Sequence, residues 1–190
     1  ISGYVLFYIM IAFSQIYAKS APIISEAGYV MGLGFSPQIF TALLMFSSVS
    51  LAITITISGK YIDKVGRRIW LIWTTVGVAL FGLALPYFLK NGTTVSLFWF
   101  LITGMGLIGM GYGPLSSFLP ELFPTHVRYT GSSLTYNIAG LFGASVAAII
   151  ALPLNANYGL KGVGIYLTLN AILSLIGLWF IEETRDRQLL

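Results

Sequence analysis

Ten residues of the sequence, 59–68, place four cationic side chains and one carboxylate between two long apolar stretches that carry no charge. Each stretch reaches the ~20 residues that an α-helix needs to cross the hydrocarbon core of a membrane. Cationic residues that flank membrane spans stay on the cytoplasmic side. The segment therefore predicts a short cytoplasmic loop between two membrane spans, and it orients the spans around it.

The composition supports a membrane protein. Hydrophobic residues make up 57% of the chain and charged residues 8%, against roughly 45–50% and 25% in soluble domains. The net charge of +4 comes from cations beside apolar stretches, so we expect contact with membrane lipid and no nucleic-acid partner. With no cysteine and one histidine, the sequence predicts no metal site and no cofactor.

Six stretches are long and apolar enough to cross a membrane. We expect helices throughout, because a strand exposed to lipid would leave backbone groups unpaired, and the alternation of a β-barrel strand is missing. The sequence has no linker that would separate domains. The prediction is an all-α integral membrane protein in which residues 1–190 form one six-transmembrane-helix bundle. The expected spans are about 1–21, 37–58, 69–89, 96–118, 131–153 and 162–181.

The cations predict the topology. Seven of ten lie in the loops after the second and fourth spans and in the tail, and three lie on the other side. We therefore expect a multi-pass protein of the cell (inner or plasma) membrane with both ends cytoplasmic and with segments 21–37, 90–96 and 154–161 outside. Trp70 and Trp73 are expected at the inner interface. The two groups of cations are Lys60, Lys64, Arg67, Arg68, Arg128, Arg185 and Arg187, against Lys19, Lys90 and Lys161.

Three motifs indicate a family. Residues 59–68 fit the pattern Gly-x-x-x-Asp-(Arg/Lys)-x-Gly-Arg-(Arg/Lys), which resembles the signature loop of major facilitator secondary transporters. Residues 120–131 (PELFPTHVRYTG) and the tail sequence Glu-Thr-Arg at 183–185 resemble the metabolite:proton symporters, with sugar porters next. Those families carry these motifs in the second half of a twelve-span chain. The resemblance therefore implies a carboxy-terminal six-span half of a major facilitator fold, whose partner is a missing amino-terminal six-span half.

Charged residues at the predicted cytoplasmic helix ends suggest a gate. Asp63 and Glu121 are anions that a bundle would bring near several arginines. Exposed ion pairs are worth only ~0–1 kcal/mol each, so a gate made of them can close and still reopen. Glycines in the same motif permit a tight turn. The alternative is that these charges only set the topology. The predicted gate residues are Gly59, Asp63, Gly66, Arg67, Arg68, Glu121, Arg128 and Arg185.

The fourth span contains a candidate hinge. Several glycines precede Pro114 there, and proline removes one helical hydrogen bond. Gly109 and Gly113, four residues apart, allow another helix to approach closely. Two interpretations stay open: ordinary packing of small residues, or a helix that bends during transport, which the resemblance favours.

Polar residues within the spans are candidates for substrate contact, because such residues usually face the interior of a bundle. In the first span Tyr8 and Gln15 fall close to one stripe, and the resemblance implies that this span lines the central cavity. The amide of Gln15 can both donate and accept, although a hydrogen bond between helices is an equal alternative. Tyr136 and Asn137 in the fifth span complete the predicted substrate cavity.

The predicted function is secondary active transport of a small polar metabolite, coupled to protons as a symporter and working by alternating access. Since no span has Asp, Glu or His at its middle, the proton-carrying carboxylate is expected in the missing half, at Glu26 or on the substrate. An enzyme is disfavoured because the sequence offers no nucleophile and base, and no pair of catalytic carboxylates. The alternative is a non-transporting sensor or receptor, or a six-span subunit.

Overall fold

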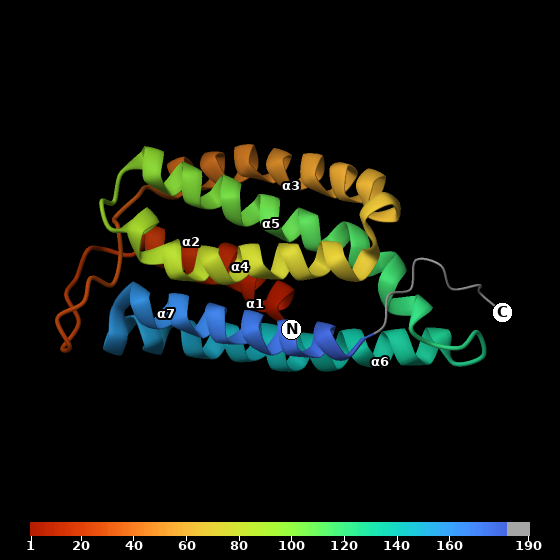
Figure 1. Cartoon of the computed structure of the whole chain (residues 1–190). Coiled ribbons are helices and arrows are strands. Elements are labelled where there is room, and N and C mark those ends of the chain that lie inside the picture. Colours follow the sequence, from red (N-terminus) through yellow and green to blue (C-terminus); the bar gives the residue numbers. More distant parts are fainter. Residues whose placement is uncertain (182–190) are drawn as a thin grey trace.

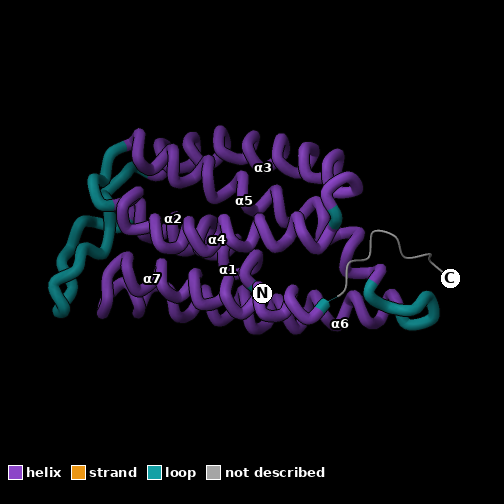
Figure 2. Tube along the Cα trace, in the orientation of Figure 1, coloured by secondary structure: helices purple, strands orange, loops and turns teal. Residues whose placement is uncertain are grey.

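The computed structural model describes residues 1–181, whose regular structure is helical (Figures 1 and 2). An isolated bridge between Ile24 and Val30 is the sole β-type pairing among these residues. The predicted all-α class is confirmed. In chain order the elements are α1 (Ser2–Tyr8), the π-helical turn η1 (Ile9–Phe13), α2 (Ser14–Lys19), α3 (Pro37–Val65), α4 (Arg67–Leu89), α5 (Thr94–Glu121), α6 (Arg128–Gly140), the π-helical turn η2 (Leu141–Ser145) and α7 (Val146–Phe180).

Four helical stretches are long and apolar enough to cross a membrane: Pro37–Val65, Arg67–Leu89, Thr94–Glu121 and Arg128–Phe180. The last has 53 residues, more than twice the ~20 that one crossing needs, and it bends at Gly159, where φ is +65°. The first helical segment, from Ser2 to Lys19, is divided by η1. The count of six spans stays a prediction.

The charged segment 59–68 is not a loop, contrary to expectation. Helix α3 continues to Val65 and α4 begins at Arg67, so Gly66 alone separates them. Its φ of +102° lies in the region that favours glycine, and this one residue turns the chain. Gly59 lies inside α3, where an added Cβ would meet nothing within 4 Å. Gly59 is therefore not the turn residue that the motif suggested.

The expected outer loop 154–161 is likewise helical, apart from one residue. Helix α7 includes this segment, and its backbone leaves the helical conformation at Gly159. Asn155, expected in an exposed turn, is fully buried. As at Gly66, a single glycine with positive φ does the work that a longer loop was expected to do.

The connections gather at two ends of the elongated bundle (Figure 1). The Gly66 end holds the α3–α4 turn and segment 122–127, and the Gly159 end holds segments 20–36 and 90–93 and the bend in α7. The connecting segments that were predicted to share a side of the membrane thus lie at the same end of the bundle. Which end faces the cytoplasm stays a prediction.

Two close helix contacts hold the bundle together. Ser58 of α3 donates from Oγ to the carbonyl of Gly109 in α5 at 3.4 Å. On the other side of the bundle, a Cβ on Gly164 of α7 would collide with the carbonyl oxygen of Gly82 in α4. Small residues therefore let the backbones approach, as they do in other membrane bundles.

Candidate functional site

A largely buried ion pair joins α4 to α5 at the Gly66 end. Arg67, the first residue of α4, forms an ion pair with Glu121, the last residue of α5, and their side chains are only 19% and 15% exposed. Asp63 of α3 lies 3.4 Å from the Arg67 guanidinium and is 72% exposed. The structure thus brings together three of the predicted gate residues.

The helix dipoles argue that this ion pair does more than stabilise its own helices. A cation is unfavourable at the first turn of a helix and an anion at the last turn. Arg67 and Glu121 occupy those unfavourable positions. Because each residue is poorly placed within its own helix, the pairing stabilises chiefly the contact between α4 and α5.

Arg68 contacts the carboxyl end of α7 through main-chain carbonyls. Its Nε donates to the carbonyl of Leu178 and its Nη2 to that of Trp179, both at 2.9 Å. A cation at the carboxyl end of a helix compensates the dipole and caps free carbonyls. Arg68 therefore fastens α4 to the end of α7.

Arg128, another arginine of the predicted gate, makes no ion pair that the structure shows among residues 1–181. Arg128 begins α6 and is half-buried. Within residues 1–181, its Nε has no hydrogen-bond partner. Arg185 lies outside the described residues. Of the described part of the predicted gate, the structure shows the pairing of Arg67 with Asp63 and Glu121.

The four predicted substrate residues do not share one pocket. Gln15 and Asn137 are exposed, and the Asn137 amide donates to the carbonyl of Ser133 at 2.8 Å. Tyr8 is half-buried. Tyr136 alone of the four lines the cavity described next.

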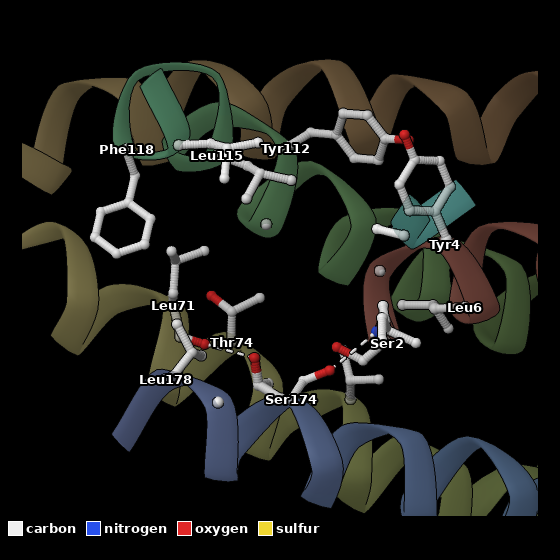
Figure 3. A pocket seen from close by; sticks show the side chains of 18 of the residues that line it. Ser2, Tyr4, Leu6, Leu71, Thr74, Tyr112, Leu115, Phe118, Ser174 and Leu178 are labelled. Atoms are coloured by element: carbon white, nitrogen blue, oxygen red, sulfur yellow. Dashed lines mark hydrogen bonds between the residues drawn. The ribbon is translucent and has the colours of Figure 1, made fainter. Parts of the chain in front are cut away.

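A cavity of about 500 Å³ opens among α1, α4, α5, α6 and α7 (Figure 3). Most of its lining is apolar, including Leu71 and Phe118. Tyr4 and Tyr112, which Figure 3 shows pointing toward one another, bring hydroxyl groups to it. The Thr74 hydroxyl donates instead to the carbonyl of Trp70 at 2.9 Å.

The candidate hinge in α5 is closely packed. A Cβ on Gly109 or Gly113 would strike α3, at Thr54 and Ser58 respectively. Pro114 is buried within α5, which extends as one helix from Thr94 to Glu121. The structure shows the packing role of these glycines, and a bending role remains a proposal.

The sequence matches the family model described as "Sugar (and other) transporter" over residues 5–190. The chain belongs to this family of the major facilitator superfamily. The predicted membership of the major facilitator superfamily is confirmed. The family and the relatives below are transporters and not enzymes.

Several relatives of this chain support its assignment to the family. A Haemophilus influenzae protein named "Putative metabolite transport protein" is 85% identical over 100% of this chain and 42% of its own length. The inner membrane metabolite transport protein YhjE of Escherichia coli is 40% identical over the same shares. A proline/betaine transporter of Salmonella typhimurium is 31% identical over 70% of this chain and 27% of its own length. No solved structure gives a significant match.

This chain spans less than half the length of the relatives that match all of it.

The sequence analysis did not predict two features that bear on the site. Tyr112 lies between two glycines of the candidate hinge, and nothing in its spacing indicated a cavity position. The π-helical turns η1 and η2 interrupt α-helical segments without a proline or a charge to mark them.

Proposed function

We propose that this chain is the carboxy-terminal half of a secondary active transporter that moves a small polar metabolite by alternating access. The match of residues 5–190 to a transporter family carries the proposal. The names of two relatives, a metabolite transport protein and a proline/betaine transporter, favour small polar substrates. The proposed location is the inner membrane, with the Gly66 end in the cytoplasm.

The proposed cytoplasmic gate centres on Arg67 and Glu121. This pair is largely buried, whereas Asp63 adds an exposed contact worth only ~0–1 kcal/mol. Opening this end requires α4 and α5 to separate there, which exposes both charges to water. Water compensates a separated ion pair, so the pair can hold one state and still release. Arg128 and Arg185 complete the proposed gate.

We place the proposed substrate surface on a face of the bundle that includes Gln15 and Asn137, each of which is exposed. An amide facing hydrocarbon is unfavourable without a hydrogen-bond partner. In the proposed assembly the amino-terminal half of the transporter covers this face, and Tyr8 and Tyr136 contribute hydroxyls to the shared cavity. Proton coupling is proposed as well, with the titrating carboxylate in that other half, at Glu26 or on the substrate.

Uptake by the full-length chain in proteoliposomes tests the proposal. We expect a proton gradient to drive accumulation of a small polar metabolite. We also expect Gln15→Ala to raise the apparent dissociation constant of that metabolite. Losing one hydrogen bond costs ~0.5–1.5 kcal/mol, which corresponds to ~2–13-fold in affinity. Ser96→Ala, at the amino end of α5, is the control and should leave the constant unchanged. Binding without uptake or counterflow would favour a sensor instead.

A further inference from the structure

Pro114 deprives one carbonyl of α5 of its usual donor. Proline has no N–H, so the helical hydrogen bond from residue 114 to the carbonyl of Met110 cannot form. A carbonyl left unpaired within a membrane is strongly unfavourable. A neighbouring helix supplies the missing donor, because Nε1 of Trp70 in α4 lies 3.0 Å from the Met110 carbonyl oxygen.

Other carbonyls around Pro114 also receive side-chain donors. The Ser116 hydroxyl donates to the carbonyl of Gly113 at 2.9 Å, and the Ser117 hydroxyl to that of Pro114 at 3.1 Å. These serines belong to α5 itself and move with it. The bond from Trp70 differs because it crosses to another helix and takes the acceptor that the proline frees.

We propose that Trp70 is a positioning residue that ties the Pro114 region of α5 to the charged end of α4. The proposal rests on the proposed transport function and adds a mechanical link to it. Trp70 lies one helical turn from Arg67, whose partner Glu121 ends α5. The indole bond and the ion pair therefore join the same two helices, on the same side of the bundle, on either side of the proline.

The cavity makes this link consequential. Leu71 and Gly111, the residues that follow Trp70 and Met110 in the chain, both line it. A bend at Pro114 that breaks the indole bond must shift this wall of the cavity. Trp70 thus couples the shape of the cavity to the gate.

The exposure of the two tryptophans separates this role from simple anchoring at the membrane interface. Trp73 of the same helix is 71% exposed and suits an interfacial anchor. Trp70 is half-buried, and its N–H is engaged with α5. Trp73→Phe is therefore the matched control for Trp70→Phe.

A double-mutant cycle on the full-length transporter tests the bond itself. Pro114→Ala supplies a backbone N–H for the Met110 carbonyl, so Trp70 is no longer required there. We expect Trp70→Phe to lower the thermal midpoint by about 1–3 °C in the wild-type background and by less than half as much beside Pro114→Ala. Equal losses in both backgrounds would overturn the proposal, because they would show that only the packing of the indole matters.

Uptake kinetics test the link to transport. Trp70→Phe is expected to change the maximal rate by about fivefold or more while KM stays within about twofold, and Trp73→Phe should change neither. A rise in KM with an unchanged maximal rate would refute a positioning role. The double-mutant cycle measures thermal stability and requires no transport. The absence of the indole bond and the absence of transport would therefore give different results.

Discussion

The two ends of the bundle are held by different kinds of contact. At the Gly66 end, charged side chains join separate helices, with Arg67 paired to Glu121 and Arg68 bonded to the end of α7. At the Gly159 end, segment 20–36 folds back on the bundle through its own backbone. The amides of Leu33 and Phe35 donate to carbonyls of Tyr17 and Ala18 at 3.0 and 2.8 Å.

The same segment also docks on α7. Asn155 donates to the carbonyl of Val30 at 3.3 Å, and Ser25 donates to that of Ala156 at 2.7 Å. The Tyr29 ring fills the space where Gly159 lacks a side chain. The contacts at the Gly159 end are hydrogen bonds to backbone carbonyls, made by backbone amides and polar side chains. The Gly66 end depends instead on side-chain charges that water can solvate. On this difference we propose that the Gly66 end separates during transport while the Gly159 end stays joined.

The largest expected effect is the removal of one charge at the Gly66 end. Glu121→Ala removes the less exposed of the two carboxylates that the structure shows paired with Arg67, at a cost of roughly 2 kcal/mol or more, below the ~3–5 kcal/mol of a fully buried pair. We expect a drop of at least tenfold in transport rate by the full-length chain. Asp63→Asn touches the exposed contact and should cost ~0–1 kcal/mol. Equal effects of the two variants would show that burial does not set the strength of this end.

Some of this arrangement could be predicted from the sequence. The uncharged apolar stretches gave the all-α class and most helix positions, because length and the absence of charge suffice for that. The two one-residue turns, at Gly66 and Gly159, were not predicted, since a glycine in a positive-φ turn and a glycine in a helix look alike in sequence. Gly66 and Gly59 stand in the same motif, and only Gly66 has the positive φ.

The contacts of the candidate site were harder to predict. A helix that is apolar on all sides has no clear polar face, so the sequence leaves its rotation about its own axis undetermined. The orientation of Trp70 toward Met110 and the placing of Tyr112 at the cavity both depend on that rotation. The partner of Arg68 was missed because carbonyls at a helix end carry no side-chain signature.

A substitution at the Gly159 end should affect transport less than Glu121→Ala does. Asn155→Ala removes the donor to the Val30 carbonyl and one buried amide, at a cost of ~1–3 kcal/mol. Limited proteolysis of segment 20–36 should become several-fold faster, while transport is affected less than by Glu121→Ala. Asn157→Ala, on the exposed surface nearby, is the control. If Asn155→Ala stops transport without loosening the segment, this end takes part in the transport motion and the contrast between the ends is wrong.

The smallest expected effects distinguish the two glycines of the charged motif. Gly66→Ala forces a Cβ onto a backbone at φ +102° and ψ +137°, a conformation that favours glycine, which costs ~1–3 kcal/mol. Gly59→Ala fills open space within α3 and should stabilise the protein by ~0.4–1 kcal/mol, because alanine loses less conformational entropy in a helix. Thermal midpoints of the two full-length variants should therefore move in opposite directions. A loss of stability in both would mean that the chain turns at Gly59 as well, and the Gly66 end would then be the looser loop that its charges suggest.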